Sequence, residues 1–117
     1  MKMVIVLTHG SNSDKSTVCF TMGNASLDAG NEVAVFMVSD GVYCSKAGYP
    51  DKTHVPPFKP LGELIESFTA KGGQIWACIP CVEHRGLKED DLRPETTLTD
   101  ASLMLQWVGA GASTVSL

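Results

Sequence analysis

The chain lacks both a cluster of basic residues and a hydrophobic run long enough to cross a membrane. Only 9 of its 117 residues are lysine or arginine, against 13 aspartates and glutamates, and the formal net charge is −4. Phosphate binding uses grouped positive charge, so a nucleic-acid partner is disfavoured. No stretch approaches the roughly 20 apolar residues of a membrane span. We therefore expect a protein that binds neither nucleic acid nor membrane.

The N-terminus also lacks the hydrophobic region of a secretory signal. Its apolar run ends at Thr8 after about five residues, short of the roughly seven that such a region needs. We therefore expect a cytoplasmic protein. The chain has four cysteines, and cytoplasmic cysteines are more often reduced, catalytic or metal-bound than paired as structural disulfides.

The composition predicts one folded domain that spans residues 1–117. Hydrophobic residues make up 44% of the chain and charged residues 19%, which is ordinary for a globular protein and unlike a disordered one. A chain of this length can bury a core but is too short to divide into two domains.

Continuous apolar runs alternate along the chain with segments whose apolar residues recur at helical spacing, and this pattern predicts strands and helices. Met3–Leu7, Glu32–Val38 and Gln74–Ile79 are typical of strands buried on both faces. Helical spacing separates them, from Ser13 or Asp14 to Ala29 and from Pro60 to Gly72–Gly73. The remaining expected elements are a long loop at Asp40–Pro60, a short helix within Glu83–Arg93 interrupted at Gly86, a small strand at Pro94–Thr97, a helix from Thr99 or Asp100 to Gly109, and a strand at Thr114–Leu117.

This alternation predicts an α/β fold, a three-layer α/β/α sandwich around a mostly parallel sheet of about four or five strands. Catalytic groups in open sheets of this kind gather where the strands end at their carboxyl termini. One set of polar and sulfur-bearing residues follows the three main strands and should share that edge: Ser11, Asn12, Asp40, Cys44, Cys78 and Cys81.

The segment Gln74–Leu87 contains the strongest chemical signal. Its apolar strand leads directly into Cys78-Ile-Pro-Cys81, and Arg85 follows. A thiolate is the reactive form of cysteine, and a nearby helix start or cation raises its population. Cys78 is therefore the candidate reactive thiol, and Arg85 together with free backbone N–H groups of the turn would stabilise its charge.

The same spacing is compatible with two other chemistries. In a dithiol of the thioredoxin type, Cys81 would resolve a mixed disulfide on Cys78, although such folds need an antiparallel hairpin that is not evident here. In a non-enzymatic metal-binding or assembly module, Cys78 and Cys81 would join His84. The candidates for a fourth metal ligand are Cys44, His54 and His9.

Other motifs favour structural roles. Residues 10–16 resemble a phosphate loop, but His9 and Asp14 occupy positions where that loop needs glycine, so we expect a polar loop with helix-capping residues. Cys19 lies beside the apolar stripe of its predicted helix and is expected to be buried. For Cys44, burial and function are both open.

Four short motifs together resemble the DsrE/DsrF-like family of small intracellular sulfur-relay proteins. They are Val4–Thr8, Asp40–Val42, Cys78–Leu87 and Trp107–Leu117, and they span nearly the whole chain. The resemblance implies a five-stranded parallel α/β/α fold, assembly into homo-oligomeric trimers or hexamers, and one cysteine that carries sulfur as a persulfide.

Cys78 is the position that matches this sulfur-carrying cysteine. The resemblance implies no metal or organic cofactor, and the implied partners are sulfur donor and acceptor proteins or small persulfides. In this hypothesis Arg85 stabilises the Cys78 thiolate, and Cys81 or Cys44 assists or resolves.

Overall fold

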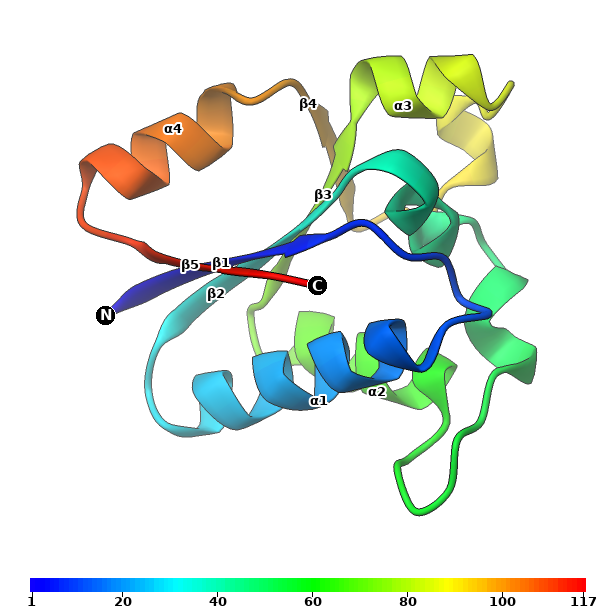
Figure 1. The fold of residues 1–117 in the computed structure, drawn as a ribbon, viewed down its shortest axis with the longest axis horizontal. Coiled ribbons are helices and arrows are strands. Elements are labelled where there is room, and N and C mark those ends of the chain that lie inside the picture. Colours follow the sequence, from blue (N-terminus) through cyan, green and yellow to red (C-terminus); the bar gives the residue numbers. More distant parts are fainter.

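The continuous apolar runs of the sequence form the centre of one parallel sheet. The structure, a computed structural model, describes residues 1–117 (Figure 1). All four strand pairings are parallel, which confirms the predicted α/β fold. The strands lie in the order β4 (Thr96–Thr99), β3 (Gln74–Cys78), β2 (Glu32–Met37), β1 (Lys2–Leu7) and β5 (Ser113–Ser116).

Helices cover both faces of the sheet and make the three predicted layers. Helices α1 (Asp14–Asp28) and α2 (Leu61–Ala70) lie side by side on one face, and α4 (Ser102–Gly109) lies on the other (Figure 1). The larger core cluster packs between the sheet and α1 and α2, where the Phe20 and Phe68 rings meet edge to face. A smaller cluster lies under α4, where Trp107 packs edge to face on Trp76.

Short helical segments occupy the edge where the strands end. Two 3-10 helices, η1 (Ser39–Ser45) and η2 (Tyr49–Lys52), occupy much of the region predicted to be an irregular loop, and η1 starts one residue before it. Helix α3 (Ile79–His84) follows β3, and a third 3-10 helix, η3 (Glu89–Asp91), precedes β4. None of the helices combines the length and the apolar character that a membrane crossing requires.

Several predicted boundaries were wrong. Strand β3 ends at Cys78 and α3 starts at Ile79, earlier than the helix expected within 83–93, because Pro80 is well suited to a first helical turn. The helix ends before Gly86, whose φ of +68° is left-handed. The small strand lies at Thr96–Thr99, later than predicted. Helix α4 begins at Ser102, whose backbone N–H donates a hydrogen bond to the Asp100 side chain.

Gly41 allows η1 to pack against the end of β1. A Cβ atom at this position would overlap the Leu7 carbonyl oxygen, which already accepts a hydrogen bond from the Val38 backbone N–H. Any larger residue must therefore displace backbone, and the residues after β2 would move with it.

We predict that Gly41→Ala lowers the free energy of unfolding by about 1–3 kcal/mol, the usual cost of overpacking a close contact. Urea denaturation followed by circular dichroism measures this change. Gly109→Ala is the matched control, since no atom lies within 4 Å of its added Cβ and a helical alanine is expected to be neutral or stabilising by up to about 1 kcal/mol. Equal midpoints for the two variants would contradict the steric argument.

Candidate functional site

The junction of β3 and α3 brings the two cysteines of the motif together. Cys78 is the last residue of β3 and Cys81 lies in the first turn of α3, so the chain turns back between them. The Cys81 thiol donates to the Cys78 sulfur, and the two Sγ atoms are 2.7 Å apart. Both cysteines are free and half-buried. The pair is therefore open to a reactant from solvent.

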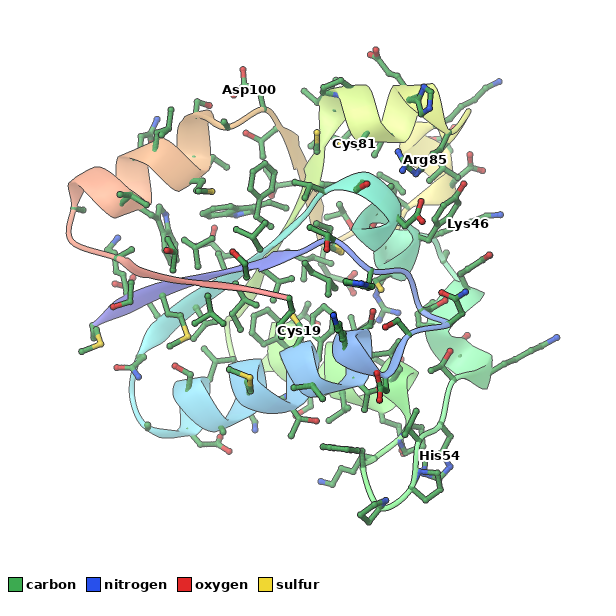
Figure 2. The ribbon with its side chains drawn as sticks, viewed as in Figure 1. Cys19, Lys46, His54, Cys81, Arg85 and Asp100 are labelled. Atoms are coloured by element: carbon green, nitrogen blue, oxygen red, sulfur yellow. The ribbon has the colours of Figure 1, made fainter.

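The other two cysteines lie inside the protein. Cys19 and Cys44 are 0% and 1% exposed, and both belong to the larger core cluster. Figure 2 shows Cys19 between α1 and the sheet, away from Cys81. The expectation of burial is confirmed for Cys19, and the open question about Cys44 is answered in favour of burial.

Burial also keeps these inner thiols protonated. Desolvation raises the pKa of Cys44 to about 11, although a hydrogen bond with Ser16 partly opposes this shift. The pKa of Cys19 is also raised, first by burial and then by the proximity of Cys44. Neither residue is a candidate nucleophile at neutral pH.

Arg85 links α3 to the segment that follows β2. Its Nη2 and Nε atoms donate to Asp40 Oδ1 at 2.9 Å and 3.1 Å. Its Nη1 atom donates to the Cys81 carbonyl oxygen at 3.2 Å, satisfying a backbone acceptor that the short helix leaves free. The guanidinium also lies 6.0 Å from the centre of the Tyr43 ring. Arg85 thus lies beside the cysteine pair but is already engaged by other groups.

The expectation of a stabilised Cys78 thiolate is not met. The pKa of Cys78 is raised, first because burial disfavours the thiolate and second because of the hydrogen bond from the Cys81 thiol. A backbone hydrogen bond from Cys81 and the positive charge of Arg85 act in the opposite direction without reversing the shift. The sequence pattern placed the arginine near the thiol but did not show that Asp40 neutralises part of its charge.

An open hollow of about 480 Å³ lies beside the pair. Cys81 contributes a wall of this hollow, so a reactant can approach it there. Ser39, with a positive φ of 53°, lies on the opposite element, at the start of η1. The complete lining consists of Val38, Ser39, Pro80, Cys81, His84 and Arg85.

Only part of the predicted neighbourhood comes together as one site. Asp40, Arg85, Cys78 and Cys81 are connected by hydrogen bonds. The other three residues lie in the loops of that edge. The Ser11 carbonyl oxygen accepts a hydrogen bond from Thr53, and Asn12 is exposed. The buried Cys44 thiol lies 3.8 Å from the His9 carbonyl oxygen. None of these three forms a hydrogen bond with the cysteine pair.

The alternative in which Cys78, Cys81 and His84 hold a metal ion finds no support in the geometry. No group of three or more histidine, cysteine, aspartate or glutamate side chains is arranged to hold a metal ion. His84 is exposed, while His54 lies in the loop before α2, well away from Cys81, and its Nε2 atom contacts the Phe58 carbonyl oxygen (Figure 2). The spacing of Cys78, Cys81 and His84 suggested ligands, but the helical geometry of α3 does not make them converge.

Sequence reasoning missed Ser39 and Tyr43 as neighbours of the site. Ser39 Oγ lies 3.5 Å from Arg85 Nη2, and the Tyr43 ring stacks on that of Tyr49 with centroids 5.4 Å apart. Their position after β2 was the available signal, because the carboxyl ends of parallel strands share one edge. Because Asp40–Pro60 shows no periodicity in the sequence, the 3-10 helix η1, which contains Ser39 and Tyr43, was not predicted.

Fold and site together define a parallel α/β/α domain with an accessible cysteine pair at the carboxyl end of a central strand. The chain belongs to the DsrE/DsrF-like family, whose model matches residues 1–117. It is 36% identical over 84 residues to the uncharacterised protein MK0008 of Methanopyrus kandleri, covering 71% of this chain and 65% of that protein. It is 32% identical over 95 residues to the uncharacterised protein MJ0989 of Methanocaldococcus jannaschii, covering 79% and 78%.

The chain thus spans just under two thirds of the length of MK0008. Two solved structures show the same fold. The YchN protein from E. coli superposes with a TM-score of 0.79 at 16% identity, with full coverage of both chains. Protein MTH1491 from Methanobacterium thermoautotrophicum gives 0.75 at 13% identity, covering 99% of this chain and 98% of its own. The likeness to these structures concerns the fold alone.

We predict that Cys78 is alkylated more slowly than free cysteine at neutral pH, and that its rate climbs as pH rises above the usual thiol range. The direction follows from the raised pKa, since less thiolate is present at pH 7. Cys81→Ala removes a group that raises this pKa and should accelerate the reaction several-fold, whereas Arg85→Gln removes one that lowers it and should slow it.

Iodoacetamide labelling, with the Cys78 peptide quantified by mass spectrometry across pH, measures these rates. Glu83→Gln serves as the matched control, because Glu83 is an exposed residue of the same helix and is not among the causes of the pKa shift. Changes of the same sign in Cys81→Ala and Arg85→Gln would refute the electrostatic account.

Proposed function

We propose that this protein is a sulfur carrier of the sulfurtransferase type, which holds sulfur as a persulfide on Cys78. The observation that supports this most strongly is the division of the four cysteines. Two are buried in the core, and the other two form one accessible pair at the edge of the sheet. Membership of the DsrE/DsrF-like family also favours a sulfur-relay role.

In the loading step, the Cys78 thiolate attacks the outer sulfur of a donor persulfide. A bond forms between that sulfur and Cys78 Sγ, and the donor leaves as a thiolate. The raised pKa of Cys78 makes the thiolate scarcer at neutral pH but also a stronger nucleophile, because nucleophilicity increases with thiol pKa. Arg85 favours the charged form, since its positive charge lowers the pKa of Cys78.

In the delivery step, an acceptor thiolate attacks the outer sulfur and Cys78 leaves as the thiolate. The proposed partners are sulfur donor and acceptor proteins or small persulfides, which would approach at the hollow beside Cys81. The reducing cytoplasm is the compartment we expect, because free thiols persist there.

The short distance between the two sulfur atoms favours a second candidate function, in which the pair acts as a dithiol that reduces disulfides. Cys78 would attack a disulfide and Cys81 would release the mixed disulfide. The wholly parallel sheet differs from the thioredoxin-like arrangement, which includes an antiparallel hairpin. A function of this kind would therefore use the motif on another scaffold.

We predict that Cys81→Ser gains one sulfur atom after incubation with glutathione persulfide, whereas Cys78→Ser/Cys81→Ser gains none. Removing Cys81 from both proteins prevents the neighbouring thiol from competing for the sulfur. Intact-mass spectrometry measures the addition, and conversion of cyanide to thiocyanate by the loaded protein measures the transferable sulfur. Equal loading of the two variants would refute the assignment of Cys78, and a persistent mixed disulfide with glutathione would favour the dithiol function.

We also propose that the protein assembles into a homo-oligomer, a trimer or hexamer, as the family resemblance implies. Two features of the C-terminal region support self-association. Residues 101–117 contain no charged side chain, and Leu105 and Val108 of α4 are 64% and 41% exposed. Apolar surface of this kind is common where proteins contact one another.

We predict that Leu105→Lys shifts the protein from oligomer towards monomer, because a charge would then have to be buried at the contact. Light scattering coupled to gel filtration measures the mass. Gln106→Lys is the control, since Gln106 is an exposed polar residue of the same helix. A monomeric wild type, or an unchanged oligomer in Leu105→Lys, would contradict this proposal.

A further inference from the structure

We propose that Cys81 discharges the sulfur on Cys78 as hydrosulfide and leaves a Cys78–Cys81 disulfide. The same edge of the sheet would thus be a sulfide-releasing site as well as a sulfur-carrying one. This inference rests on the proposed function, because its substrate is the Cys78 persulfide. A sulfur carrier needs only the Cys78 thiol, so the inference gives Cys81 a role of its own.

The geometry places the second thiol within reach of the bond that must break. The sulfur atoms are 2.7 Å apart, and Cys78 Sγ becomes the inner sulfur of the persulfide once loading has occurred. Cys81 is then the nearest thiol to that inner sulfur without any movement of a partner. Well-oriented intramolecular reactions proceed as though the reactant were present at very high concentration.

The surrounding elements hold the pair in this arrangement. Strand β3 pairs with β2 up to Ala77 and with β4 up to Cys78, so the inner sulfur is carried by a fixed position. Cys81 is held by α3, where the Arg85 side chain bonds its carbonyl oxygen and the same arginine is bound to Asp40. The attacking and attacked sulfur atoms therefore need only a small approach to reach bonding distance.

The reaction balances without an external oxidant. The Cys81 thiol loses its proton to solvent, and its thiolate attacks Cys78 Sγ. The Cys81 Sγ–Cys78 Sγ bond forms while the bond from Cys78 Sγ to the outer sulfur breaks. The outer sulfur leaves with the bonding electron pair and, taking up a proton from solvent, departs as hydrosulfide. It is thereby reduced, and the Cys81 sulfur is oxidised.

The product must be reopened before another sulfur can be loaded. A dithiol reductant would supply the electrons, becoming a disulfide itself and restoring both cysteine thiols. Cys81 lines the open hollow, so such a reductant can reach the disulfide there. Delivery to an acceptor thiol would then compete with discharge by Cys81, and the site would release sulfide whenever no acceptor is bound.

The test loads the reduced full-length chain with glutathione persulfide, removes excess reagent by gel filtration, and follows intact mass and free sulfide over time. Wild type should lose the mass of two hydrogen atoms relative to the reduced chain and release about one sulfide per chain, as the reaction requires. Cys81→Ser should retain one added sulfur atom for at least about ten times longer, because the intramolecular nucleophile is gone.

Cys81→Ala repeats the measurement with a side chain that cannot donate a hydrogen bond, and Glu83→Gln, an exposed change on the same helix, should behave as wild type. A wild-type persulfide as long-lived as that of Cys81→Ser would overturn the inference while leaving the carrier function standing. A wild-type disulfide formed without sulfide would also overturn it. If Cys81→Ser gains no sulfur at all, the carrier function itself fails.

Discussion

The parallel pairing of β2 with β3 is the constraint on which the site depends. Because the two strands run in the same direction and in register, Phe36 beside Trp76 and Met37 beside Ala77, they end at the same edge. The segments that follow them, η1 and α3, are therefore neighbours. Asp40 in η1 and Arg85, the residue directly after α3, form the ion pair that joins these segments. An antiparallel arrangement would have separated the carboxylate, the guanidinium and the two thiols.

That ion pair has two opposing effects on the chemistry of the edge. It holds α3 in place, because Arg85 also bonds the Cys81 carbonyl oxygen and its side chain is only 17% exposed. It also leaves less of the guanidinium charge available to the Cys78 thiolate, and the effects of burial and of Cys81 prevail. The site is thus better suited to positioning sulfur atoms than to creating a permanently charged thiolate. The proposed sulfur exchange tolerates this, because a scarce thiolate of high pKa is also a strong nucleophile.

The fold was predictable because its main strands are continuous apolar runs. Runs such as Val33–Val38 and Ile75–Ala77 have no polar alternation, so they had to be buried on both faces, and the intervening helical patterns required parallel crossovers. The edge elements were less predictable. Strand β4 consists of Thr96–Thr99, in which only Leu98 is a large apolar residue, and its place beside β3 is determined by tertiary pairing.

The candidate site was predictable in some of its members but not in its electrostatics. The position of Cys78 at the end of an apolar strand identified it, and Pro80 after it made an immediate helix start reasonable in retrospect. The sign of the pKa shift at Cys78 depends on burial and on the contact with Cys81, neither of which a linear pattern reveals. The engagement of Arg85 by Asp40, distant in sequence, is likewise a property of the folded chain.

The interior position of Cys19 and Cys44 has a practical consequence for studying the molecule. Both thiols are shielded from solvent by the core between the sheet and α1, so a bulky maleimide can reach them only after that layer separates. Labelling of Cys19 and Cys44 would therefore report when α1 separates from the sheet in the native protein. This labelling is independent of the surface pair, which would be labelled first, and no foreign probe has to be engineered into the chain.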